Sequence, residues 1–201
     1  MAITTGAELA TAVGNWLARA DLTSRIPEFV ALAEAKFNRS LRTRQMITRN
    51  SSFSINAEYV ALPTGFLETK DFYLNTSPKK TLAYLPSDTE SDYFTGTGTP
   101  RFYTIVGDSF RFGTVPDATY TATLTYYTAL TSVSAGGSAV NWLLTAHPDA
   151  YLYGALLEAA GYLSDDGRVP MWTSAMAQVL DSIRSADAFG RMGNAMAVRA
   201  A

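Results

Sequence analysis

The chain carries few residues of the types that catalyse reactions. His147 is its only histidine, and the 201 residues include no cysteine. A zinc site would need two or three further nitrogen or sulfur ligands, which this composition does not supply. The order His147-Pro148-Asp149 predicts the start of a helix, because proline favours the first helical position and an early aspartate complements the helix dipole. We therefore interpret His147 as structural.

Asp165 and Asp166 are the clearest candidates for a carboxylate pair, of the kind used in acid–base chemistry or in Mg²⁺ binding. Ser164, Gly167 and Arg168 surround them, and these neighbours favour a tight turn between two helices. The pair is interpreted as part of that turn.

Gly96-x-Gly98 is the nearest approach to a phosphate-binding loop. The third glycine is missing, and Pro100 followed by a strand pattern stands where a helix should open. The Gly-x-Ser-x-Gly pattern of serine hydrolases is absent from the sequence. We expect no cofactor and no metal, and we expect the protein not to be an enzyme.

A basic run occupies residues 36–49, KFNRSLRTRQMITR, with no acid among its charges. Cations near a helix C-terminus are favourable by themselves, and one interpretation of the run is therefore a helix end. Alternatively it lines something negative, either DNA phosphates or an acidic partner surface. Five charges on one copy would hold DNA poorly at physiological salt, whereas copies arranged in a ring would form a continuous positive belt.

Composition describes a globular protein, with 47% hydrophobic and 17% charged residues. The net charge of -2 arises from 16 basic and 18 acidic residues, which excludes a global field that would hold nucleic acid or an anionic membrane. No stretch approaches the ~20 apolar residues that span a bilayer. We expect a soluble protein made in the cytoplasm.

Hydrophobic periodicity divides the chain into helical, strand and helical thirds. Helices are predicted over residues 5–18, with a Thr5–Glu8 capping box, and over 23–41. Period-two alternation covers residues 45–128 and includes a hairpin turning at Gly107-Asp108. A Gly/Ser loop is predicted at 132–139. One further helix is predicted to begin at Pro148, and another to run over residues 170–188.

These elements predict an α+β fold, namely a helical bundle built from the N- and C-terminal helices with an inserted antiparallel β-sheet or small barrel domain. The predicted segments are 1–44 (N-terminal helices), 45–131 (β domain), 132–188 (C-terminal helices) and 189–201 (flexible tail).

The run NWLLTAHPDAYLYGALLEAAGYLSDDGRVPMW, residues 141–172, carries a family resemblance. VALPTGFLE at 60–68 contributes a Leu-Pro-x-x-Phe element. The stretch from TPRFYTIVGDSFRF to VPDATYTATLTYYTAL contributes a Pro-x-x-Tyr entry and a closing Tyr-Tyr strand. In this order the motifs resemble the head-to-tail adaptor (connector) proteins of tailed phages, to which adaptors of gene transfer agents are related.

The resemblance implies a structural adaptor in the neck of a virion. It implies a ring of about a dozen copies beneath the portal, linked to the tail and leaving a channel for DNA. The implied partners are the portal protein, stopper or tail proteins, further copies of this chain, and DNA passing without sequence specificity, with no membrane.

Two sets of residues are candidates for these contacts. Flexible Met and Arg side chains suit adaptable interfaces, which predicts portal docking by Arg184, Arg191, Met192, Met196 and Arg199. The basic run supplies candidates for the channel or an interface between copies, namely Lys36, Arg39, Arg42 and Arg44.

Two other interpretations stay open. A stopper or tail-completion protein of the same particle fits the composition nearly as well. A hydrolase or carbohydrate-binding module would use the aromatic β segment and would require a pocket with converging carboxylates.

Overall fold

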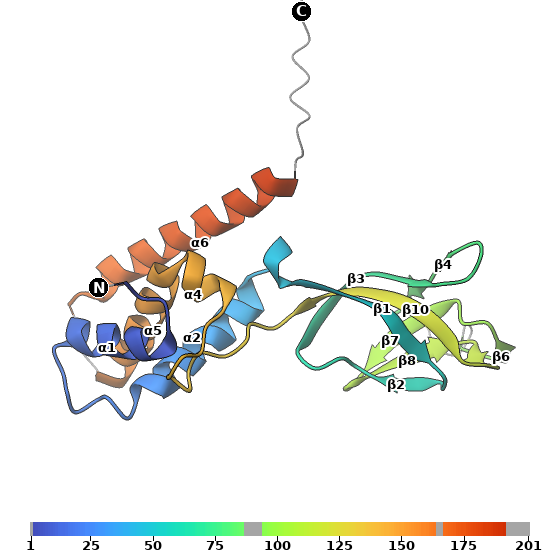
Figure 1. Ribbon diagram of the computed structural model, residues 1–201, viewed down its shortest axis with the longest axis horizontal. Coiled ribbons are helices and arrows are strands. Elements are labelled where there is room, and N and C mark those ends of the chain that lie inside the picture. Colours follow the sequence, from blue (N-terminus) through green and yellow to red (C-terminus); the bar gives the residue numbers. More distant parts are fainter. Residues whose placement is uncertain (1, 87–93, 164–166, 192–201) are drawn as a thin grey trace, which may run out of the picture. The chain divides into compact units, whose positions relative to one another are not determined.

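The structure, a computed structural model, describes residues 2–86, 94–163 and 167–191 (Figure 1). Its chain forms two compact units. The helical unit comprises residues 1–45 and 130–201, and the β unit comprises residues 46–129. Each unit has its own elements and is described by itself.

The helical unit is organised around one central helix. Its described helices are α1 (Gly6–Leu17), α2 (Ile26–Ser40), α4 (Trp142–Ala146), α5 (Pro148–Leu163) and α6 (Val169–Arg191). Helix α5 packs against all four of the others (Figure 1). Its buried residues, among them Tyr151, Leu152 and Ala155, point to several sides of the helix. A helix that is apolar all round belongs inside a core, and α5 takes that position.

Helix α1 begins with the predicted capping box, which is confirmed. The Thr5 hydroxyl accepts the Glu8 backbone N–H at 3.3 Å, and the Glu8 carboxylate accepts the Thr5 N–H at 3.1 Å. The loop at 136–139 meets the same helix end, because the Gly6 N–H donates to the Ala139 carbonyl at 2.9 Å. A Cβ on Gly6 would lie 2.6 Å from the Val133 carbonyl oxygen, so this close approach requires glycine.

A buried carboxylate on α2 holds the segment that follows the β unit. Glu34 is 6% exposed, and it accepts hydrogen bonds from the Val133 N–H at 2.7 Å and the Ser132 hydroxyl at 2.6 Å. The Tyr151 hydroxyl, from α5, donates to it at 3.2 Å. One turn later on α2, the Asn38 side chain accepts the Leu130 N–H at 2.9 Å. Two positions of α2 thus anchor residues 130–133.

The β unit contains ten strands in the described part of the chain. The longer ones are β1 (Ile47–Ile55), β3 (Phe66–Leu74), β7 (Phe102–Val106), β8 (Ser109–Gly113) and β10 (Tyr120–Thr128). The short ones are β2 (Tyr59–Ala61), β4 (Lys80–Thr81), β5 (Ala83–Tyr84), β6 (Thr97–Gly98) and β9 (Val115–Pro116). They form sheets in the orders β1-β10-β3-β4, β2-β8-β7-β5 and β6-β9. The β5–β7 and β6–β9 pairs are parallel.

Aromatic side chains from the two four-stranded sheets meet to form the core of the β unit. Phe110 of β8 contacts Phe53 of β1 at 5.8 Å and Phe72 of β3 at 5.3 Å between ring centroids. Phe66 approaches Phe110 edge-on at 5.4 Å and stacks on Tyr126 at 5.7 Å. These offset and edge-on geometries are the favoured ones for ring pairs. The aromatic-rich alternation of the sequence therefore encodes contact between sheets.

Several predicted elements are confirmed. Ile47–Ile55 and the other strands fall within the period-two region, and the hairpin joins β7 to β8 through Gly107, whose φ is 58°. Helix α5 begins at Pro148, as the His-Pro-Asp order predicts. At the centre of β10 both faces are buried, because Ala122, Thr123 and Leu124 are all at most 2% exposed.

The predicted fold class is wrong. The described residues mix α and β, but ten strands stand against five α-helices, and the chain is strand-rich and not a helical bundle of terminal helices with one inserted sheet or small barrel. The helices surround α5 without aligning as a bundle, because α5 has no single apolar stripe. Four strands of two residues each are too short to show a period-two pattern. A prediction from periodicity therefore underestimates the number of strands.

The Glu34 network yields a stability prediction. Glu34→Leu should lower the free energy of unfolding by about 2–4 kcal/mol, because it leaves buried donors without an acceptor. Glu34→Gln keeps one acceptor oxygen and should cost about 1 kcal/mol. Glu28→Leu, an exposed change on the same helix, is the control and should stay within about 0.5 kcal/mol. Equal losses for Glu34→Leu and Glu28→Leu in urea unfolding would contradict the assignment.

The α1 cap predicts a pH dependence. Hydrogen bonds from the Thr4 hydroxyl, and then from the Thr4 backbone, lower the pKa of Glu8. A carboxyl with a lowered folded-state pKa adds stability above its ordinary pKa, and that stability disappears as pH falls through the lowered value. The melting-temperature gap between the native chain and Glu8→Gln should therefore close on acidification. Thr4→Val should return the Glu8 titration, followed by NMR, toward the ordinary value, and an unmoved titration would count against this cap.

Candidate interaction site

The structure brings together four arginines that the sequence had placed in two separate sets. Arg42 and Arg44 follow α2, while Arg184 and Arg191 lie in the last turns of α6. We call these four residues, with Asp187 at their centre, the arginine cluster. A cavity of about 250 Å³ at this place is lined by Arg42, Thr43, Arg184, Asp187, Ala188 and Arg191.

Asp187 organises the arginine cluster. It is only 7% exposed, and its carboxylate accepts the Arg44 backbone N–H at 2.7 Å. The Arg191 guanidinium pairs with the other carboxylate oxygen at 2.6 Å and also donates to the Arg42 carbonyl at 2.7 Å. The final turn of α6 is thereby fixed to residues 42–44.

The four guanidinium groups differ in what they contact. Arg42 donates to the carbonyls of Asn38 and Leu41, both at 2.7 Å, and so satisfies carbonyls at the end of α2. Its role is therefore the helix-end role that the sequence offered as one interpretation of the basic run.

Arg44 and Arg184 are the more accessible members. The Arg44 guanidinium lies over Gly190, where a Cβ would come within 1.9 Å of Nη1, so the glycine leaves room for it. The Arg184 side chain is 51% exposed and meets the still more exposed Asp181 at 3.4 Å, a geometry that contributes little to stability. Among the described residues, the ion pairs at this place are Arg191–Asp187 and Arg184–Asp181.

Lys36 and Arg39 lie on a different part of α2. They line a cavity of about 420 Å³, together with Phe37, Met176 and Leu180. The Lys36 ammonium forms an ion pair with Glu158 of α5. The basic run is therefore not one continuous surface, because its residues line two separate cavities. Met192, Met196 and Arg199 lie outside the described residues.

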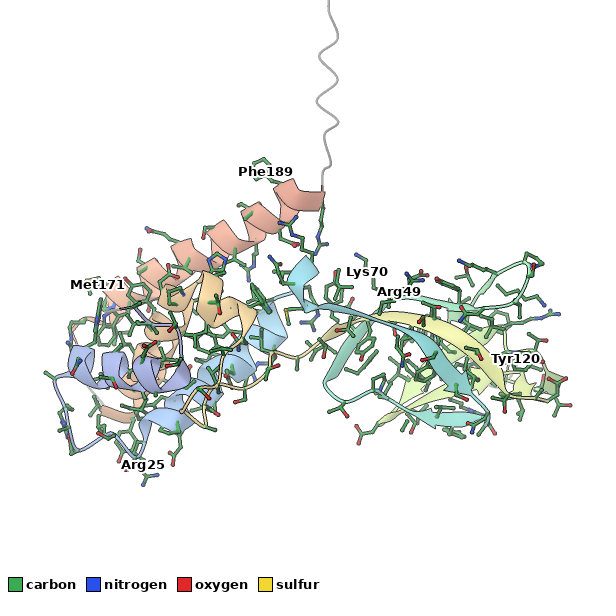
Figure 2. The ribbon with its side chains drawn as sticks, viewed as in Figure 1. Arg25, Arg49, Lys70, Tyr120, Met171 and Phe189 are labelled. Carbon is green, nitrogen blue, oxygen red and sulfur yellow. The ribbon has the colours of Figure 1, made fainter. Side chains whose placement is uncertain are left out.

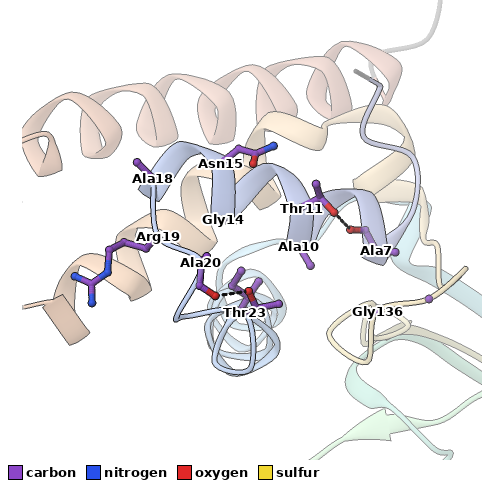
Figure 3. A pocket seen from close by; sticks show the side chains of 12 residues that line it. Ala7, Ala10, Thr11, Gly14, Asn15, Ala18, Arg19, Ala20, Thr23 and Gly136 are labelled. Carbon is purple, nitrogen blue, oxygen red and sulfur yellow. Dashed lines mark hydrogen bonds between the residues drawn. The ribbon is translucent and has the colours of Figure 1, made fainter.

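A cavity of about 750 Å³ follows α1 and the glycine-rich loop (Figure 3). Its lining is mostly small side chains such as Ala7, Ala10 and Gly14, and Arg19 is its one ionisable lining residue. Asp21 holds the Arg19 guanidinium through two contacts at 2.7 and 2.6 Å, and Arg19 in turn lowers the pKa of Asp21. This cavity offers surface for packing and no acid–base pair of its own.

His147 and Gly98, two candidates for chemistry in the sequence, each lie at the end of a short element. The His147 backbone N–H donates to the Leu143 carbonyl at 2.8 Å, in the turn between α4 and α5. Gly98 ends the short strand β6, and the chain continues into a further strand after Pro100. Asp165 and Asp166 lie outside the described residues. Within the described ranges, no three His, Asp or Glu side chains gather as a metal site would require.

Two buried acids of the helical unit, Glu34 and Asp187, were not predicted as functional residues from the sequence. Glu34 falls among the apolar positions Val30, Ala33 and Phe37, and Asp187 falls one turn after the buried Ile183. A charge within an apolar stripe was the available signal, since buried charges require partners.

Comparison with known protein families identifies the family of this chain. The model of the SU10 adaptor protein family matches residues 4–199. The chain belongs to that family. No curated protein matches it.

Membership of the SU10 adaptor family confirms the resemblance to phage head-to-tail adaptors and supports a structural role in a virion. Some of the motif residues behind the resemblance stabilise the helical unit. Asn141 caps α4 through the Leu144 N–H at 2.9 Å and donates to the Tyr151 hydroxyl at 2.6 Å, while Trp172 is fully buried. Across the described ranges, the helices are too short or too polar to span a membrane.

The role of Asp187 can be tested by substitution. Asp187→Ala should lower the free energy of unfolding by about 1–3 kcal/mol, because the Arg44 N–H and the Arg191 guanidinium lose their acceptor. Asp187→Asn keeps an oxygen for the Arg44 N–H and should cost less. Hydrogen exchange at the Arg44 amide should quicken in the alanine variant. Asp181→Asn, on the exposed side of α6, is the control, and equal losses at the two positions would refute the central role of Asp187.

Proposed function

We propose that this chain is a structural head-to-tail adaptor that forms a ring beneath the portal, links it to the tail and leaves a channel for DNA. Its membership of the SU10 adaptor family supports the adaptor role. The proposed partners are the portal protein, stopper or tail proteins, further copies of this chain and passing DNA. The protein acts through these surfaces and not through catalysis.

The observation that carries the docking part of the proposal is the arginine cluster at the end of α6. Two residues chosen for portal docking, Arg184 and Arg191, lie there beside Arg42 and Arg44. Residues 192–201, which include the other three proposed docking residues, follow directly in the chain. One positive surface and one adjoining segment therefore supply the proposed contact, and its partner surface should be acidic.

The ring is proposed from the family role together with the modest charge of one copy. A head-to-tail contact between identical chains closes into a ring when its rotation allows, and the ring repeats each positive surface around an axis. Lys36 and Arg39 are proposed for the channel or for the contact between copies, because they line their own cavity. The segments 1–44, 45–131, 132–188 and 189–201 are proposed as the corresponding working parts.

Charge reversal tests the docking surface. Arg184→Glu should weaken binding to the purified portal by about tenfold, because a cation that faces an acidic surface becomes a like charge. Arg25→Glu is a matched control: Arg25 lies at the other end of α2, is 50% exposed and also has an acidic neighbour at i,i+3 spacing (Figure 2). The loss should shrink as salt is raised. Equal weakening by both variants would remove the arginine cluster from portal docking.

Deleting residues 192–201 separates the tail from the arginine cluster, because it keeps the Asp187–Arg191 pair. Portal binding measured by size-exclusion chromatography should be lost while the thermal melt is unchanged. Binding to a stopper or tail protein in place of the portal would favour the stopper interpretation.

A further inference from the structure

The β unit contains a second concentration of anion-binding groups, separate from the arginine cluster. A cavity of about 400 Å³ is lined by Lys80, Thr97, Gly98, Thr99, Arg101, Phe102 and Thr114. The lining comes from β4, β6, the start of β7 and the residue after β8, so the fold assembles it from four places in the sequence. Its described lining residues include two cations and three hydroxyls, and none of them is an acid.

The two cations are available to a ligand. Lys80 and Arg101 are exposed, and among the described residues neither forms an ion pair. By contrast, Arg111 elsewhere in the same unit is held by Glu58 at 2.8 Å. A bound anion would supply a partner to Lys80 and Arg101, through charge-assisted hydrogen bonds.

The hydroxyls divide into two roles. Tyr120 donates its only hydroxyl proton to Asp117 at 2.5 Å, so in the 3.2 Å contact between Thr99 and Tyr120 the threonine is the donor. Thr99 is therefore held in place by that chain of bonds, at the end of the β unit where Tyr120 lies (Figure 2). Thr97 and Thr114 remain as donors toward the cavity.

We propose that this cavity binds a phosphate group, supplied either by a nucleic-acid backbone or by free phosphate. Lysine, arginine and threonine together form the donor set that commonly contacts phosphate oxygens. A protein anchor is disfavoured, because interface pockets that carry binding energy hold aromatic or aliphatic side chains, and the one large apolar lining residue here is the half-buried Phe102. The inference goes beyond the adaptor function, since a single chain suffices for it.

Neighbouring lysines provide a sharp test. Lys80 lines the cavity, whereas Lys79 lies 5.0 Å from the centre of the Tyr73 ring and does not line it. The full-length chain, labelled with ¹⁵N, is titrated with inorganic phosphate at constant ionic strength. The amides of Thr97, Gly98 and Thr114 should shift and saturate. Lys80→Ala and Arg101→Ala should each weaken binding by about tenfold, while Lys79→Ala should change it little.

The titrations distinguish a nucleic-acid backbone from free phosphate, and they also show whether the cavity binds phosphate at all. A short duplex DNA that shifts the same amides, and that phosphate displaces, identifies a nucleic-acid backbone as the source. Saturable phosphate binding without DNA competition identifies free phosphate. Equal weakening by Lys79→Ala and Lys80→Ala, no saturation, or tighter binding of a poly-glutamate peptide would each overturn the proposal. Loss of portal docking with this binding intact would leave the site standing and reject the adaptor function alone.

Discussion

The helical unit depends on a buried carboxylate. Residues 130–133 must be bound to α2, and Glu34 and Asn38, one helical turn apart, supply the acceptors. Glu34 is compensated by three hydrogen-bond donors, one of which is Tyr151 of the central helix α5. Burial, and then the Glu34 charge, raise the pKa of Tyr151, so the phenol keeps the proton that it donates. An apolar residue at position 34 would pack but could not hold the loop.

The hydrogen-bond network around Glu34 also includes Asn141, which begins the family motif at residues 141–172. Asn141 caps α4 and donates to both the Thr131 carbonyl and the Tyr151 hydroxyl, which links the loop, α4 and α5 in one network. Such networks specify one arrangement of buried elements only when every member is satisfied. The polar residues at 34, 141 and 151 therefore help to define how α2, α4 and α5 are placed.

Local features of this fold could be predicted from sequence, and its long-range pairings could not. The Thr5–Glu8 cap, the Gly107 hairpin and the helix start at Pro148 each depend on neighbouring residues. The place of β10 between β1 and β3 depends on strands far apart in the chain, as does the contact of Asp187 with the Arg44 N–H across 143 positions. Periodicity reports which face of an element is buried, but it does not report what that face contacts.

Positive charge on this chain is concentrated locally, because the whole chain is nearly neutral. A chain with net charge -2 has no long-range attraction for polyanions, so binding depends on local groups of cations. Arg42 and Arg191 are held at helix ends, which fixes the backbone around them, while Arg44 and Arg184 remain exposed beside them. A rigid base under exposed cations reduces the entropy lost when a partner binds. In the proposed ring, each local group of cations would be repeated around the axis, and this repetition would strengthen binding to a partner that contacts several copies.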